Sequence, residues 1–240
     1  MADKLGRLRR PVRLDPLATQ TFDIIKDAIF QGRLLPGQAL REMQLAKSFS
    51  VSQATVREAL AQLEQTGLVV RSATRRITVT SFSREEIRDR LAMRLVLEEM
   101  AAVKAGEKLN EEELAELWEL ARSISELVRG KDHFAVTQAD VQFHRTVWMA
   151  SGSAVLEKTL TQLTTPLFAF LSVLHKKGMV DLRNAKPHEP IVEALETRKA
   201  ANIRREIHKH IEGSYQEFFD TGLPSLNALV NGDAKETVGD

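Results

Sequence analysis

The stretch LREMQLAKSFSVSQATVREALAQLEQTGLVVRSATRRITVT, residues 40–80, decides the fold of the first part of this chain. It predicts a short helix over residues 44–49, a tight turn at 50–52 and a second helix that ends near residue 65. Two short strands follow over residues 68–70 and 77–80, with a turn between them at 72–76. This order is typical of a winged helix-turn-helix, whose second helix enters the major groove of DNA.

The second of these helices has two different faces. Its apolar residues recur at helical spacing and mark a buried side: Val56, Ala59, Leu60 and Leu63. Gln53 and Arg57 lie one turn apart on another side, with the small Ala54 beside them, as close approach to a major groove requires. Ser52 stands at the N-cap position, so we expect the positive end of the helix dipole to face the DNA.

The charge of the chain is divided unevenly. Residues 1–80 hold 13 Lys and Arg against 7 Asp and Glu, whereas the other 160 residues hold 21 against 26. A basic first third suits a polyanion and an acidic remainder does not, so we expect nucleic-acid contact only at the front of the chain. The chain has no cysteine, no apolar run of membrane-spanning length and no signal-peptide core at its start, and we expect a cytoplasmic protein without membrane contact.

The rest of the chain indicates helices only, which makes the fold class mainly α with a C-terminal all-helical bundle. We predict four regions: a mobile basic arm (1–16), a winged helix-turn-helix (17–81), an all-helical effector and metal-binding domain (83–222) and a flexible tail (223–240). The expected helices cover residues 17–31 in the first domain, and 83–106, 110–128, 133–150, 154–177, 191–197 and 201–220 in the second. Ser83 with Glu86 forms a capping-box signature, and the helix they open places Ile87, Leu91, Leu95 and Met100 on its apolar side.

All six histidines lie in the helical part. Asp140 and His144 are one helical turn apart, so their side chains can converge on one ligand. His210 falls within the apolar stripe of the last helix, whereas His208 falls on its solvent-facing side. His188 stands where a Pro-rich loop runs into a helix. One acid and three imidazoles suit zinc, nickel or a similar divalent ion, but an inward histidine is also a common hydrogen-bonded core residue. His133, His175 and His208 are expected to face solvent.

Two segments resemble a known family. VSQATVREAL (51–60) with LEQTGLV (63–69) closely resembles the winged-helix signature of GntR-type bacterial transcription regulators, and the helical part resembles their FadR-like subgroup with its FCD effector domain. In that subgroup an Asp and a His one turn apart, and two later histidines, bind a divalent metal. The resemblance therefore implies that Asp140, His144, His188 and His210 are the ligands.

The resemblance also bears on DNA contacts and on the effector. The family commonly has arginine at the position of Gln53 and proline at that of Thr55, so the operator read by Gln53, Ala54, Thr55 and Arg57 is expected to differ from the common one. The wing arginines, Arg71, Arg75 and Arg76, can either solvate a turn or contact phosphates, and their place beside the second helix favours phosphates. The first effector-domain helix of the family often has an arginine near the ligand cavity.

Arg94 matches that arginine, although an ion pair with Glu98 at i+4 explains it equally well. The leading hypothesis is a homodimeric, metabolite-responsive transcriptional regulator that is not an enzyme: a repressor released from operator DNA by a small organic or sugar acid, bound at a metal-containing cavity. Two alternatives remain. A metal-dependent hydrolase could use Asp and three His to activate water, although no further general base stands beside them. A helical scaffold with packing histidines would bind no metal.

Overall fold

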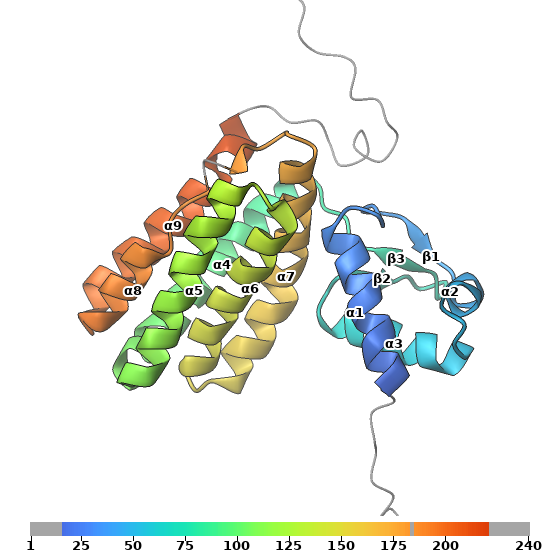
Figure 1. The fold of residues 1–240 in the computed structure, drawn as a ribbon, viewed down its shortest axis with the longest axis horizontal. Helices are drawn as coiled ribbons and strands as arrows, with labels where there is room; N and C mark the ends of the chain where they lie inside the picture. Colours follow the sequence, from blue (N-terminus) through green and yellow to red (C-terminus); the bar gives the residue numbers. More distant parts are fainter. Residues whose placement is uncertain (1–15, 183–184, 221–240) are drawn as a thin grey trace, which may run out of the picture.

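The computed structural model describes residues 16–182 and 185–220, and in these ranges the chain forms a small winged head beside a bundle of helices (Figure 1). The predicted tail (223–240) and all but the last residue of the predicted arm (1–16) lie outside the described residues. Within the described ranges no helix has both the length and the apolar character needed to cross a membrane.

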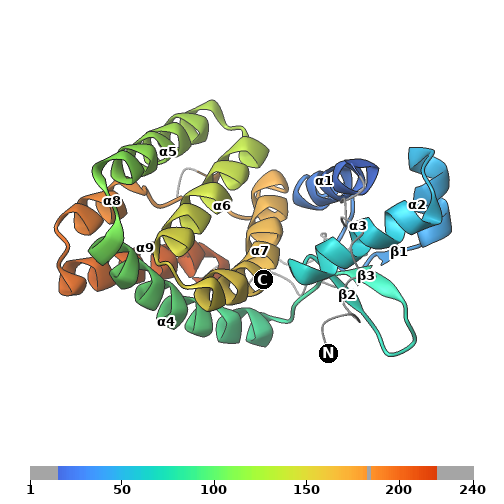
Figure 2. The same ribbon diagram turned by 90° about the horizontal axis from the view of Figure 1, so that it is seen from below.

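The head holds three helices and a three-stranded sheet. Its elements are α1 (Pro16–Phe30), β1 (Ala39–Leu40), α2 (Glu42–Phe49), α3 (Gln53–Gln65), β2 (Val69–Arg71) and β3 (Ile77–Val79). The strands are antiparallel in the order β1-β3-β2, with Leu40 opposite Ile77 and Val70 opposite Thr78. β2 and β3 project from the head as the wing (Figure 2). The strand β1 was not predicted, because two residues are too few to show an alternating pattern.

The bundle consists of the six remaining helices. They are α4 (Arg84–Lys108), α5 (Glu111–Gly130), α6 (His133–Ala150), α7 (Ala154–Lys176), α8 (Glu189–Glu196) and α9 (Ala200–Asp220). The predicted capping box at the start of α4 is present, since Ser83 Oγ accepts from the Glu86 N–H and the Glu86 carboxylate accepts from the Ser83 N–H. Pro166 lies inside α7, as expected.

The structure corrects the predicted apolar side of α4. Met100 is 47% exposed, and the face turned into the bundle carries Ile87, Arg94, Glu98, Ala101 and Ala105 instead. Met100 was predicted to lie inside because it is apolar and close to the heptad register. The true inner face includes a buried ion pair, which hydrophobic periodicity cannot detect.

Helix α7 joins the bundle to the head, and in both views it is the bundle helix that faces α1. Leu156, Leu160 and Phe168 of α7 belong to the same buried cluster as the core of the head. Lys176 Nζ donates a hydrogen bond to the carbonyl oxygen of Gln31 at 2.7 Å, just after α1. The head is therefore packed against the helix that also lines the interior of the bundle.

Candidate DNA-reading surface and metal centre

Helix α3 presents the expected two faces. Val56, Ala59, Leu60 and Leu63 are all fully buried, while Gln53, Ala54 and Arg57 are exposed. Ser52 is the N-cap residue, and its Oγ accepts a hydrogen bond from the N–H of Thr55 at 3.0 Å. The Arg57 guanidinium lies 2.9 Å from Glu42 Oε2 of α2, which holds it at the surface of the helix pair.

Thr55 does not share this exposed face. It is 5% exposed, and its hydroxyl lies 2.9 Å from Ser52 Oγ, so it supports the start of the helix. Because the Thr55 side chain is buried, its predicted contact with DNA is not supported. Arg71, Arg75 and Arg76 of the wing are exposed, with Arg71 Nε 3.2 Å from Glu64 Oε2. Arg75 stands at the wing tip with a φ of 60°, a left-handed conformation that turns the chain there.

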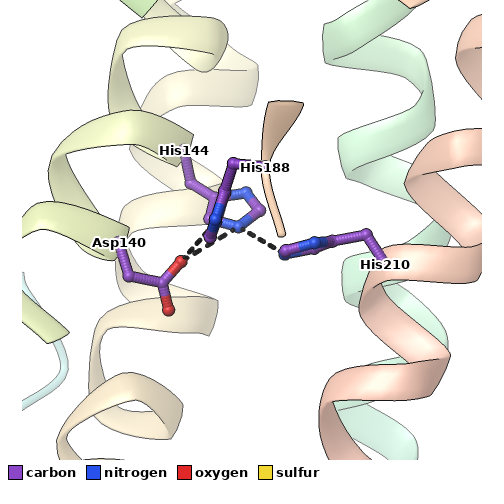
Figure 3. Close-up of side chains that lie close together, drawn as sticks. All are labelled: Asp140, His144, His188 and His210. Carbon is purple, nitrogen blue, oxygen red and sulfur yellow. Dashed lines mark hydrogen bonds and ion pairs between the residues drawn. The ribbon is translucent and has the colours of Figure 1, made fainter. Parts of the chain in front are cut away.

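Four side chains from two helices and from the N-cap of a third meet inside the bundle (Figure 3). Asp140 and His144 lie one turn apart on α6, and His210 comes from α9. His188 is the N-cap residue of α8, but its imidazole makes no capping hydrogen bond and points at the other three. Side chains from three separate stretches of the sequence therefore form one cluster.

The donor atoms of this cluster are spaced as metal ligands are. The His188 Nε2 to Asp140 Oδ1 distance is 2.8 Å, His144 Nε2 lies 3.4 Å from the same oxygen, and the Nε2 atoms of His144 and His210 are 3.3 Å apart. All four donor atoms lie within 4.8 Å of one another. Metal–ligand bonds of about 2.0–2.2 Å place neighbouring ligand atoms roughly 3.0–3.4 Å apart, so the residues present fit a divalent ion.

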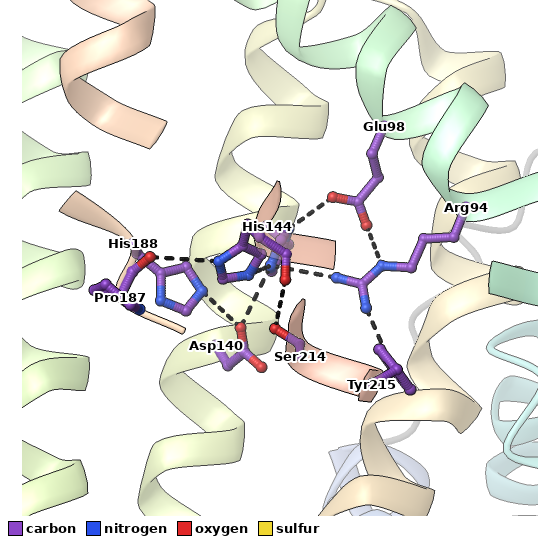
Figure 4. A network of polar contacts seen from close by, with 9 residues as sticks. Arg94, Glu98, Asp140, His144, Pro187, His188, Ser214 and Tyr215 are labelled. Carbon is purple, nitrogen blue, oxygen red and sulfur yellow. Dashed lines mark hydrogen bonds and ion pairs between the residues drawn. The ribbon is translucent and has the colours of Figure 1, made fainter. Parts of the chain in front are cut away.

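Hydrogen bonds behind the cluster orient two of the rings. His144 Nδ1–H donates to Glu98 Oε2 at 2.8 Å, and His210 Nδ1–H donates to the carbonyl oxygen of Pro187 at 3.4 Å (Figure 4). Both Nε2 atoms then face the same point, 3.3 Å apart. Histidines whose other ring N–H donates to a carboxylate or a carbonyl in this way are usual in metal sites.

Arg94 and Glu98 form a buried ion pair beside His144. Arg94 Nε lies 2.6 Å from Glu98 Oε1, and each side chain is 2% exposed. Arg94 Nη1 donates to the Tyr215 hydroxyl at 3.3 Å, and Nη2 lies 3.3 Å from His144 Nε2. The Arg94–Glu98 ion pair, one of the two interpretations of Arg94 from the sequence, is therefore present, and it is buried. One guanidinium nitrogen still faces the cluster.

These surroundings shift the pKa values of the ionisable groups in and beside the cluster. Burial disfavours the charged carboxylate of Glu98, but attraction by Arg94 and His144 outweighs it and lowers the pKa to about 2. Burial also opposes ionisation of Asp140, yet hydrogen bonds from His144 and His188 hold its pKa well below the usual value. Burial lowers the pKa of His210 well below that of free imidazole, whereas at His144 burial is outweighed by Glu98 and Asp140, which raise the pKa. Ionised carboxylate and neutral imidazole are the forms that bind metals.

Comparisons with known proteins agree with both halves of this description. The gntR family of bacterial regulatory proteins matches residues 17–79, and the FCD domain matches residues 89–213. The chain belongs to the GntR family.

This GntR-family chain has relatives that are themselves named as regulators. It is 30% identical to the "Probable D-xylose utilization operon transcriptional repressor" of Paenarthrobacter nicotinovorans, over 75% of this chain and 79% of the relative. It is 29% identical to the "Uncharacterized HTH-type transcriptional regulator YdhC" of Bacillus subtilis, over 68% and 73%. The fold is similar to that of E. coli McbR/YncC, with a TM-score of 0.73 and 22% identity over 87% of this chain and 99% of that one. The protein is a metabolite-responsive DNA-binding transcriptional regulator.

The FCD domain of this regulator has a small cavity against the cluster. The cavity measures about 50 Å³, room for a few water molecules or one small acid group. Its polar lining includes Asp140, His188, His210, Lys186 and Ser214. Arg94 does not line it, because the guanidinium lies behind His144.

One residue beside the site was not predicted from the sequence, and three other histidines are less exposed than predicted. Tyr215, the only tyrosine of the chain, is 1% exposed and contacts Arg94, and helical phase could have placed it inside, one turn after the buried Ile211 of α9. His133 and His175 are half-buried and their rings stack 6.3 Å apart, contrary to the expectation that both face solvent. His208 is half-buried as well, with Nε2 2.9 Å from Glu99 Oε2.

Proposed function

We propose that this regulator is a homodimeric repressor that leaves its operator when a small carboxylate metabolite binds at a divalent metal in the FCD domain. The observation that carries the proposal is the convergence of Asp140 Oδ1 with three imidazole Nε2 atoms in the domain that follows the DNA-reading head. The repressor role takes support from the relative of Paenarthrobacter nicotinovorans, which is named as one.

Asp140, His144, His188 and His210 would hold the ion. Three imidazoles and one carboxylate are ligands of intermediate hardness, which suit zinc or nickel. These four residues would occupy all positions of a four-coordinate ion, whereas a six-coordinate ion would keep two positions for water or a ligand. The cavity next to three of the four ligands is the place for such a ligand.

The charge of the site favours an anionic effector. The charges of Arg94 and Glu98 cancel each other at 2.6 Å, and Asp140 offsets only one of the two charges of a divalent ion. A buried site with one surplus positive charge is stabilised by an anion. A metabolite carboxylate would supply it, and Lys186 at the cavity wall would favour a second acidic or hydroxyl group. Arg94 would act on this site through His144, whose Nε2 lies 3.3 Å from its Nη2.

The DNA contact would use both heads of the dimer. Gln53 and Arg57 of α3 would read base edges, while Arg75 and Arg76 of the wing would contact phosphates. One short helix reads only a few base pairs, so two-fold symmetric half-sites are expected. An effector acts only if it binds the DNA-competent and incompetent arrangements unequally, and operator DNA must then weaken effector binding by the same factor.

Metal content of matched variants tests the metal site. We expect His210→Ala to lose the ion, because its Nε2 faces His144 Nε2. His208→Ala is the control on the same helix, since that side chain pairs with Glu99 and lies outside the cluster. Elemental analysis of both proteins after dialysis measures this, and equal metal content in the two would refute the assignment.

A titration of organic and sugar acids against operator-bound protein tests the effector. We expect at least one acid that binds the metal-loaded protein to release the DNA, and Arg94→Lys to weaken its effect. Acids that bind the metal site and leave DNA affinity unchanged would refute the proposed switch. A chromogenic ester screen on the same preparation checks for hydrolysis.

A further inference from the structure

The outer face of α4 carries an apolar stripe that no part of the described chain covers. Met93, Val96 and Met100 are 49%, 59% and 47% exposed, and their spacing of three and four residues places them on one side of the helix. Figure 2 shows α4 along the outer edge of the bundle. Three large apolar side chains exposed within two turns are a usual mark of an interaction surface.

Charged residues bracket this stripe with opposite signs. Asp89 lies one turn before Met93, and Lys104 lies one turn after Met100. Both are exposed, and neither forms an ion pair in the part of the chain that the structure describes. The stripe therefore has a negative end and a positive end, separated by apolar residues.

This arrangement is complementary to itself in the antiparallel direction. When two copies of α4 meet about a two-fold axis that passes between Val96 and Leu97, Met93 of one copy lies opposite Met100 of the other, and Val96 lies opposite Leu97. The same register places Asp89 opposite Lys104 at both ends. A shift that brings Met100 opposite Val96 would lose these pairs and place Asp89 opposite Glu107, where like charges repel. In the proposed register Glu107 lies opposite Glu86 instead, whose carboxylate is turned back to the Ser83 N–H.

We propose that a second copy of this chain covers the stripe, and that the dimer forms through antiparallel α4 helices in this register. The inference rests on the proposed homodimer and names its surface. Apolar contact supplies the affinity, and the Asp89–Lys104 pairs select the register, since exposed ion pairs contribute little affinity of their own.

The position of this surface also connects it to the effector site. Arg94 and Glu98 stand on the inner side of α4, against His144, while Val96 stands on the outer side of the same helix turn. Since α4 begins five residues after β3, its movement would change the relative placement of the two heads. The dimer surface and the effector site thus share one helix.

Sedimentation of matched variants tests the surface. We expect Val96→Glu to raise the dimer dissociation constant on the order of a hundredfold, about tenfold for each buried charge, because the axis introduces the change twice. Met43→Glu is the control, since Met43 is 71% exposed on α2 in the head. If Val96→Glu leaves the dimer intact, the surface is wrong and the homodimer stands. If the wild type is a monomer on operator DNA, the homodimer itself is wrong.

The register has its own test, because the chain contains no cysteine. A mixture of Met93→Cys and Met100→Cys proteins should form a disulfide-linked dimer under mild oxidation. Met93→Cys alone should not, since its two copies would lie seven residues, or roughly 10 Å, apart along the helices. Asp89→Lys and Lys104→Glu should each weaken the dimer, and the double variant should restore it. Crosslinking of Met93→Cys alone, or no restoration, would overturn the register.

Discussion

Replacing Gly67 by alanine should loosen the head from the bundle. Gly67 follows α3 with a φ of +76°, and a Cβ built there would lie 2.7 Å from the carbonyl oxygen of Gln162 and 3.2 Å from Pro166 Cγ, both on α7. Such a contact with backbone cannot be relieved by turning a side chain. The two segments must separate, or the turn after α3 must distort.

The size of the effect follows from two separate costs. An alanine in the left-handed region costs about 1–2 kcal/mol, and forcing an extra carbon into a packed contact costs about 1–3 kcal/mol. Gly67→Ala should therefore lower the free energy of unfolding by roughly 2–5 kcal/mol. Gly37→Ala is a matched control, because Gly37 has a φ of +79° and nothing within 4 Å of the added Cβ, so only the first cost applies.

Urea unfolding of the two variants and the wild type measures both costs, followed by the fluorescence of the two tryptophans, Trp118 and the buried Trp148. Small-angle scattering at zero urea shows whether the head separates from α7. If the two variants lose the same stability within about 0.5 kcal/mol, the contact of Gly67 with α7 contributes nothing and the described docking of the head is refuted.

Other parts of the molecule support further predictions. Arg57→Ala should weaken operator binding on the order of tenfold to a hundredfold, measured by fluorescence anisotropy, and an equal loss on random DNA would contradict base reading. Arg75→Ala should weaken binding to all sequences alike and reduce the slope against log salt by about one; a change limited to the operator would oppose a phosphate contact. Glu98→Gln should lower metal affinity by about tenfold to a hundredfold, because the carboxylate accepts from His144 and balances Arg94; competition with a chelating dye measures it, and unchanged affinity would count against the supporting role. Metal retention should fall as the pH is lowered, since protons compete for the imidazoles, and the lowered pKa of His210 should delay the loss to a lower pH than free imidazole would give; constant metal content from about pH 8 to 4 would argue against histidine ligands.

The order of elements could be predicted from local sequence alone. Periodic apolar residues, the Ser83–Glu86 capping box and the glycine turns act over one or two helical turns, so they are readable without tertiary contacts. The same holds for the exposed face of α3. The strand β1 could not be predicted, because its two residues are strands only through their pairing with β3.

The donor residues of the site were partly predictable for the same reason. The i, i+4 spacing joins Asp140 to His144, and helical phase distinguishes His210 from His208. Whether these residues meet depends on how α6, α8 and α9 pack, and sequence spacing says nothing about that distance. The inference that they form one site came from the resemblance to a family.

By itself, the sequence determined the division into a basic head and a helical domain, the faces of the helices and the kinds of donor atoms available, because charge, periodicity and caps are local properties. Only the tertiary structure decided that Arg94 and Glu98 are buried together, that Met100 faces outward and that Gly67 lies against α7. Each of these depends on which surface a neighbouring helix covers, and that choice is made by the packing of the whole chain.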